Sequence, residues 1–411
     1  MSSVNFSTAP EHGDHAALVR LRWQWLAVAL IYGILLLAAY RGLAWRWDYA
    51  YAERWLVLAV AMGAVQLGVL WRSLGHNRSD AETRLRSTLG YANALTLVRG
   101  VLLCMLAGFL FAPEPASALA WAPAILFTAA RLIDLLDGYV ARITTGPTKL
   151  GTILDIEFDG LDTLVAVILG IQYGRLPVWY LPLAVSRQLF VFGIWWRQRR
   201  GLPVYVWPPS DNRRLIAGFQ TGFLSVVLWP IFGPPATTLA AVLFAIPLLY
   251  SFGRDWLVVS AVIDAESSPY QRTRVWVKQV VEGWVPLAAR LAAAALAAWL
   301  LWQYAPQFAE WQALLAATFA SPRAVVTLLA VLFLVAGLMM ALGAVGRVAA
   351  VALIGMACLD LLAVGFDWST NALLLTLSII VTHLGSGYYA LWQPEEQLLR
   401  RPLGSARSGQ T

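Results

Sequence analysis

Long apolar runs alternate with short polar segments along most of the chain. A transmembrane helix needs about 20 mainly apolar residues, and most of the runs approach that length. A bilayer core offers the backbone no water, so these runs are expected to be helical. They cover approximately 23–40, 55–71, 91–112, 119–142, 151–170, 178–198, 213–231, 237–254, 284–302, 322–342, 347–365 and 370–391. The pattern therefore predicts an all-α integral membrane protein with about twelve membrane helices.

The polar segments divide the chain into successive parts. In chain order these are a polar tail (1–22), a helix hairpin with its connector (23–90), a six-helix core (91–256), an amphipathic link (257–283), a four-helix membrane module (284–393) and a second polar tail (394–411). The connector after the hairpin, 72–90, fits either an amphipathic helix at the membrane surface or a solvated loop.

Composition and charge narrow the class of protein. The chain is 59% hydrophobic and only 13% charged, whereas soluble domains carry about 25% charged residues. In a soluble protein the net charge of +7 would suggest nucleic acid. Here the arginines gather in the loops between apolar runs, so membrane topology explains the charge and no nucleic-acid partner is expected.

The same arginines predict the orientation of the chain. Placing the loop 142–150 in the cytosol puts most basic loops and the basic tail 394–411 on the same side. This arrangement obeys the positive-inside rule and gives cytosolic termini with an even number of helices. We therefore expect a protein of the bacterial inner membrane whose loop 142–150 faces the cytoplasm.

Four acids stand at helical spacing on either side of that loop. Asp134 and Asp137 precede it, and Asp155 and Asp159 follow it. Residues three or four apart share a helix face, so two helix ends would each show a pair of carboxylates. Converging carboxylates in an apolar setting favour bound cations, and oxygen ligands without His or Cys favour Mg²⁺ or Mn²⁺ over zinc. The alternative is that the acids are merely solvated at the ends of membrane helices.

The residues around these acids resemble a known signature. The stretch reads D-x2-D-G-x2-A-R-x8-G-x3-D-x3-D, which is similar to the signature of the CDP-alcohol phosphotransferases. Asn93, Thr96 and Arg99 extend the resemblance, because the first core helix of that family opens on a similar N-x-x-T-x-x-R pattern. The six predicted helices of 91–256 agree with the family's core architecture.

The resemblance implies a reaction and roles for single residues. The family transfers a phosphatidyl or other substituted phosphoryl group from a CDP-linked donor, here CDP-diacylglycerol, to an acceptor alcohol and releases CMP. It implies two Mg²⁺ or Mn²⁺ ions held by Asp134, Asp137 and Asp155, with Asp159 as the general base that also shares a metal. The residues implied to bind CDP are Gly138, Ala141, Arg142, Gly151, Asn93 and Thr96.

The acceptor is expected to carry its own phosphate. Lys149, Arg187, Arg213 and Arg214 border the predicted cytosolic mouth, and such cations suit a phosphorylated alcohol. Glycerol-3-phosphate is favoured, and an inositol phosphate is the alternative. Positive-inside topology alone would also account for Arg213 and Arg214.

Two further interpretations stay open. Intramembrane acids and arginines also occur in ion-coupled transporters, although no inverted repeat is visible between the halves of this chain. The module 284–393 bears a weak resemblance to DoxX-like membrane proteins and would then act as a scaffold beside the enzyme core. His383 within it is expected to be a packed residue rather than a ligand. Whether the chain forms a homodimer is left open by the sequence.

Overall fold

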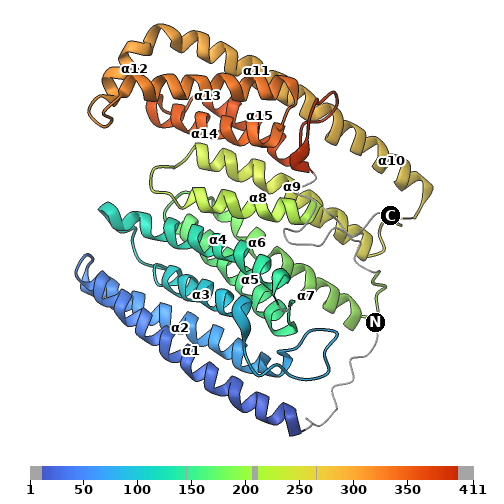
Figure 1. Ribbon diagram of the computed structural model, residues 1–411. Helices are drawn as coiled ribbons and strands as arrows, with labels where there is room; N and C mark the ends of the chain where they lie inside the picture. Colours follow the sequence, from blue (N-terminus) through green and yellow to red (C-terminus); the bar gives the residue numbers. More distant parts are fainter. Residues whose placement is uncertain (1–11, 145, 206–211, 265, 397–411) are drawn as a thin grey trace. The chain divides into compact units, whose positions relative to one another are not determined.

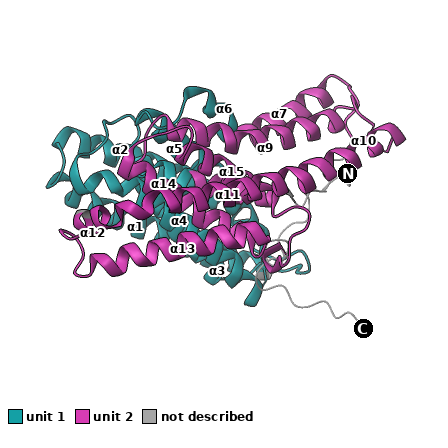
Figure 2. Ribbon diagram, turned by 90° about the horizontal axis from the view of Figure 1, so that it is seen from above, with its two compact units in different colours: residues 1–184, 224–230, 403–411 teal, residues 185–223, 231–402 magenta. Residues whose placement is uncertain are grey.

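The computed structural model describes residues 12–144, 146–205, 212–264 and 266–396. Within these ranges the regular structure is helical and no strand is formed, which confirms the all-α prediction (Figure 1). The chain divides into two compact units, which Figure 2 shows in different colours. The first contains residues 1–184 and 224–230, and the second contains 185–223 and 231–402.

Long helices that pack against one another form the first unit. α1 packs against α2, both contact α3, and α3 packs against α4 and α5. Their bounds are α1 His12–Ala44, α2 Tyr49–Ser73, α3 Gly90–Ala107, α4 Ala122–Ile143 and α5 Lys149–Gln172, with short 3₁₀ helices at Leu74–His76 and Ser117–Trp121. The predicted hairpin and the first three core helices are thus present.

The first unit closes around a small residue on α3. A Cβ atom at Gly100 would lie 2.4 Å from the Tyr32 hydroxyl and 2.8 Å from the Phe158 ring. The absence of a side chain lets Tyr32 Oη cross to α3, where it donates to the carbonyl of Leu97 at 2.8 Å. Leu97 and Phe158 belong to an apolar cluster that α1, α2, α3 and α5 share. This packing fixes α3 against α5. Asn93, Thr96 and Arg99 lie on α3, and Asp155 and Asp159 lie on α5.

The connector beyond α2 is an ordered loop rather than an amphipathic helix. Asn77 is fully buried, and its Nδ2 donates to the carbonyls of Arg86 and Thr88. The Arg86 guanidinium donates to both carboxylate oxygens of Glu82, which lowers the pKa of Glu82 to about 2. The loop is therefore closed by its own polar groups, and of the two expectations for 72–90 the loop is correct.

Helices that run to the end of the described chain form the second unit. α9 contacts α7 and α15, while α11, α13, α14 and α15 pack together. The bounds are α7 Ser186–Arg199, α8 Asn212–Val227, α9 Ala236–Val259, α10 Ser268–Gln279, α11 Val285–Tyr304, α12 Phe308–Leu315, α13 Pro322–Leu342, α14 Gly346–Val364 and α15 Asn371–Leu384. The last residues of α8, from Leu224, belong to the first unit.

Some predicted elements differ from the observed ones. The run 178–198 is not one helix: a 3₁₀ turn at Val178–Tyr180 and the short α6 Leu181–Ala184 come first, and α7 begins after Val185. α15 ends at Leu384 rather than near residue 391, because Gly385 takes φ +87°. α12 was not expected. The link joins α11 without a break, through the π-helical turn Val280–Trp284.

Eight described helices are long and apolar enough to cross a membrane, which supports the integral membrane prediction. The eight spans fall short of the predicted twelve for physical reasons. α5 carries several acids among its apolar residues, and α7, α8 and α15 have only 14, 16 and 14 residues. Short or acidic helices cross a bilayer only when neighbouring helices shield them.

Candidate metal centre

The turn between α4 and α5 brings the acids of the signature together. α4 ends at Ile143, and Gly146 adopts φ +78°, a left-handed conformation that glycine takes without strain. Thr148 then caps α5, since its Oγ1 accepts a hydrogen bond from the amide of Gly151 at 3.0 Å. The chain can therefore reverse within a few residues, and the carboxylates of both helices approach the same space.

Three of the four predicted acids form a compact group. Asp134, Asp137 and Asp155 each offer a carboxylate oxygen, and these oxygens all lie within 4.8 Å of one another. Asp137 is buried, while the other two are partly exposed. A donor set made of carboxylates suits Mg²⁺ or Mn²⁺ rather than zinc. The residues therefore fit the metal that the sequence predicts.

The fourth acid, Asp159, lies outside this group and has arginine partners. Its Oδ1 accepts from Arg131 Nη1 at 2.9 Å and lies 3.5 Å from Arg99 Nη1. The side chain keeps 46% of its surface exposed, so a substrate hydroxyl could reach it. Asp159 thus shares Arg99 with two members of the group, Asp134 and Asp155.

Two arginines complete the cluster, and the sequence analysis did not assign them to the site. Arg99 is fully buried and pairs with Asp134, and it lies 3.2 Å from Asp155. Arg131 pairs with the buried Asp162 as well as with Asp159. The spacing of the sequence could have identified Arg131 and its partner Asp162. Arg131 lies three residues before Asp134, and Asp162 lies three residues after Asp159. Each therefore shares a helix face with a signature acid.

The polar start of α3 supports the cluster directly. Thr96 Oγ1 donates to Asp137 Oδ2 at 2.9 Å, and both side chains are buried. Asn93 Nδ2 donates to Thr148 Oγ1 at 3.3 Å. A Cβ atom at Gly151 would lie 2.6 Å from Asn93 Oδ1, so this contact needs glycine. Three residues expected to bind CDP thus lie beside the acids, with Thr96 in contact with one of them.

The other residues expected to bind CDP lie at the end of α4. Gly138 leaves its helix face open except for Arg142, whose Nη1 would lie 3.3 Å from a Cβ atom at that position. Ala141 is partly exposed on the same turn of helix. A small surface beside a guanidinium allows a phosphate or planar ring to approach the backbone.

The residues expected to bind the acceptor are divided between the two units. Lys149 belongs to the first unit and pairs with the exposed Asp80 at 3.2 Å. Arg187, Arg213 and Arg214 belong to the second. Arg213 lies 3.6 Å from Asp255 Oδ2, and Arg187 and Arg214 are exposed. Arg187 was expected well inside a continuous helix, but it follows the break at Val185 and is the second residue of α7.

His383 is packed, as expected. Its ring lies between Phe219 and Phe244 at centroid distances of 5.3 and 4.8 Å, and its Nδ1 lies 3.0 Å from the carbonyl of Ile379. These aromatic contacts join α15 to α8 and α9 within the second unit.

Part of the chain, including the site, is similar to a known protein family. Residues 89–265 match the family model described as CDP-alcohol phosphatidyltransferase. The chain is 29% identical, over 142 residues, to proteins of Mycobacterium tuberculosis and Mycobacterium bovis that are named as cardiolipin synthases; the match covers 33% of this chain and 63% of theirs. It is 37% identical over 73 residues to a CDP-diacylglycerol–glycerol-3-phosphate 3-phosphatidyltransferase of Bacillus subtilis. This match covers 18% of this chain and 38% of that protein.

The matched regions are partial. The chain spans less than two thirds of the length of these curated relatives, and the matches leave most of its own residues uncovered. No solved structure matches the chain. The module 284–393 lies outside the family match, so nothing in these comparisons supports its resemblance to DoxX-like proteins.

Proposed function

We propose that residues 89–265, which match the CDP-alcohol phosphatidyltransferase family model, act as such an enzyme. The chain transfers a phosphatidyl group from CDP-diacylglycerol to a phosphorylated acceptor alcohol, with glycerol-3-phosphate favoured. The observation that carries the proposal is the group of Asp134, Asp137 and Asp155, whose oxygens lie within 4.8 Å of one another. The activity serves phospholipid synthesis at the bacterial inner membrane, with the site facing the cytoplasm.

The proposed step is an in-line displacement at the phosphorus that bears diacylglycerol. The acceptor oxygen forms a bond to that phosphorus, the bond to the bridging oxygen breaks, and CMP leaves. Two Mg²⁺ or Mn²⁺ ions held by the three acids would neutralise charge on the pyrophosphate. Asp159 takes the proton of the acceptor hydroxyl, a role supported by its exposed carboxylate beside the group.

Arg99 and Arg131 hold the acids in place for this chemistry. Arg99 spans Asp134, Asp155 and Asp159, which lie on two helices. Arg131 fixes Asp159 from α4. Acids oriented by charged hydrogen bonds lose little freedom when ligands bind, which favours a fixed geometry in the transition state. Arg142, beside the open face of Gly138, is assigned to the donor's pyrophosphate or cytosine.

The identity of the acceptor alcohol is the most specific part of the proposal. Two observations support glycerol-3-phosphate: the name of the Bacillus subtilis relative, and the amine of Lys149 at the start of α5. The longer match to proteins named as cardiolipin synthases supports a second candidate, in which phosphatidylglycerol is the acceptor. An inositol phosphate remains a third acceptor to be compared.

One assay separates these acceptors and tests the activity itself. The full chain is purified into lipid nanodiscs, and CMP release from CDP-diacylglycerol is measured with each acceptor in turn. We expect release with glycerol-3-phosphate that EDTA abolishes and Mg²⁺ or Mn²⁺ restores. Release with phosphatidylglycerol alone would identify the second candidate. Absence of CMP release with every acceptor, together with ion-dependent transport in sealed vesicles, would favour the transporter interpretation.

A further inference from the structure

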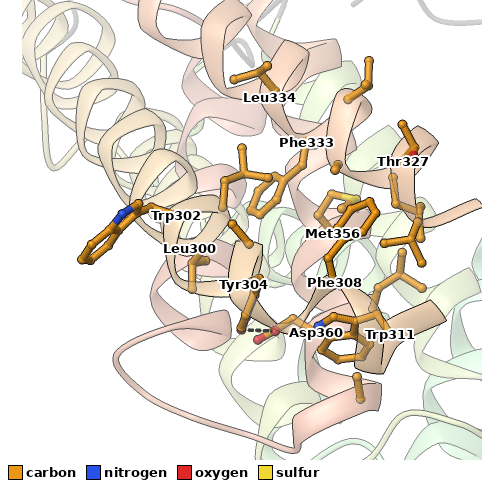
Figure 3. Close-up of a pocket in the computed structure, with 18 of the residues that line it drawn as sticks. Leu300, Trp302, Tyr304, Phe308, Trp311, Thr327, Phe333, Leu334, Met356 and Asp360 are labelled. Carbon is orange, nitrogen blue, oxygen red and sulfur yellow. Dashed lines mark hydrogen bonds between the residues drawn. The ribbon is translucent and has the colours of Figure 1, made fainter. Parts of the chain in front are cut away.

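A cavity of about 550 Å³ lies among the C-terminal helices α11–α15 and shares no residue with the acid cluster (Figure 3). Its volume lies within the range of about 300–1,000 Å³ that small-ligand sites occupy. The walls are aliphatic and aromatic and come from five helices; they include Leu300, Phe308, Trp311, Phe333, Leu334 and Met356. Walls of this kind suit a hydrocarbon chain.

One end of the cavity is polar. Asp360 accepts hydrogen bonds from the Tyr304 hydroxyl and from Asn371 Nδ2, the latter at 3.0 Å. Asn371 is 2% exposed and also donates to the carbonyl of Gly365 at 2.8 Å. These contacts orient the carboxylate, and a carboxylate has about four acceptor sites, so acceptor capacity remains for a ligand.

The carboxylate has no cationic partner among the residues that the structure describes. None of the ion pairs formed within those residues includes Asp360. Asp360 lies on α14, which is apolar enough to span a membrane. An acid within a membrane helix is costly, and such acids mark functional sites. Asn371 and Tyr304 reduce this cost but supply no positive charge.

The polar and apolar ends match the depth profile of a bilayer. Tyr304 is the last residue of α11, and Asn371 is the first residue of α15. Phe333 and Met356 lie near the middles of α13 and α14. Figure 3 shows Asp360 and Tyr304 at one end of the cavity and Phe333 and Leu334 towards the other. A lipid bound here would keep its head at the interface and its chain towards the bilayer centre.

The charges near the polar end select the headgroup. Asp360 lines the cavity, and Asp367 accepts hydrogen bonds in the turn before α15. Carboxylates without a paired cation repel an anionic phosphate and attract hydrogen-bond donors. We infer that helices α11–α15 bind a neutral lipid with a free hydroxyl, of the diacylglycerol type, whose acyl chain fills the cavity and whose hydroxyl donates to Asp360.

The inference is tested by photo-labelling of the full chain in phosphatidylcholine nanodiscs. The probe is a diacylglycerol with a diazirine in one acyl chain, and labelled peptides are mapped by mass spectrometry. We expect labelling on α13 and α14. Unlabelled diacylglycerol should compete, and phosphatidylglycerol should not. Competition by a simple long-chain alcohol as strong as that by diacylglycerol would show that hydroxyl and chain alone are recognised, in agreement with the inference.

Variants test the two ends of the cavity. Ala330→Phe fills the cavity from α13, whereas Ala324→Phe makes the same change on an exposed face of that helix, away from the cavity. We expect labelling to fall about tenfold in the first variant and to stay unchanged in the second. Asp360→Asn should lower labelling by a similar factor, because a charged acceptor makes the stronger hydrogen bond.

A comparison within the wild-type protein does not depend on any variant folding. A second probe carries a methyl ether in place of the free hydroxyl and is otherwise identical. We expect it to label α13 and α14 about tenfold less. Equal labelling by both probes, or competition by phosphatidylglycerol as strong as by diacylglycerol, would overturn the inference. Since CMP release is measured separately, its failure would leave this result unaffected.

Discussion

The hydrogen bond from Thr96 to Asp137 offers a sharp test of the metal centre. Thr96→Val keeps the shape of the side chain and removes its hydroxyl, so the carboxylate loses its donor at 2.9 Å. The hydroxyl has one proton, and its other acceptor, the carbonyl of Ala92, lies farther away at 3.2 Å. The proton is therefore expected to serve the carboxylate.

The magnitude follows from the chemistry of the bond. Hydrogen bonds to charged groups contribute about 1.5–3 kcal/mol, and loss of a partner of a metal ligand lowers metal affinity about 10–100-fold. Both side chains are buried, at 4% and 8% exposure, so water replaces the lost donor poorly. We expect Thr96→Val to weaken Mn²⁺ binding by about tenfold or more.

The assay measures binding as well as activity. Free Mn²⁺ is followed by electron paramagnetic resonance during titration of the purified chain with CDP-diacylglycerol present, and CMP release is recorded against Mn²⁺ concentration. Thr96→Ser, which retains the hydroxyl, is the matched control and should resemble the wild type. If Thr96→Val bound Mn²⁺ as tightly as the wild type, Asp137 would not be the metal ligand that we propose.

Three further changes extend the test. Asp159→Asn should reduce CMP release by at least about 100-fold while Mn²⁺ and donor binding remain, because a base acts mainly in the transition state; equal rates in variant and wild type would remove Asp159 from that role. Gly100→Ala should lower the thermal unfolding midpoint, with a cost of about 1–3 kcal/mol from overpacking, whereas Gly68→Ala, where nothing lies within 4 Å, should not. Lys149→Glu should raise the KM for glycerol-3-phosphate and leave that for CDP-diacylglycerol nearly unchanged; a rise in both would deny it an acceptor role.

The sequence predicted those features that local spacing controls. The acids lie three and four residues apart, so their helix faces followed directly from the sequence, and the loop 142–150 was expected to join the two helices. The apolar run 322–342 became α13 with the same bounds. Both results depend on residues that are close in the chain.

Features that depend on distant partners were not predicted. Arg99 was recognised only as part of the N-x-x-T-x-x-R pattern, because its pairing with Asp134, Asp155 and Asp159 depends on how α3 packs against α4 and α5. The break at Val185 fell inside a run that was assigned to one membrane helix, although polar residues begin directly after it at Ser186. The loop after α2 is ordered by Asn77, whose partners lie nine and eleven residues away.

The arginines among the acids bear on how such a protein is made. Four carboxylates entering a bilayer together would have to wait for cations, because like charges in a poor solvent repel strongly. Arg99 and Arg131 travel with the same polypeptide, so part of the charge is already compensated when the helices first meet. The repulsion that remains for metal ions to neutralise is therefore smaller. An ion that arrives later must compete with a guanidinium for the same oxygens, which makes it exchangeable rather than a permanent part of the fold.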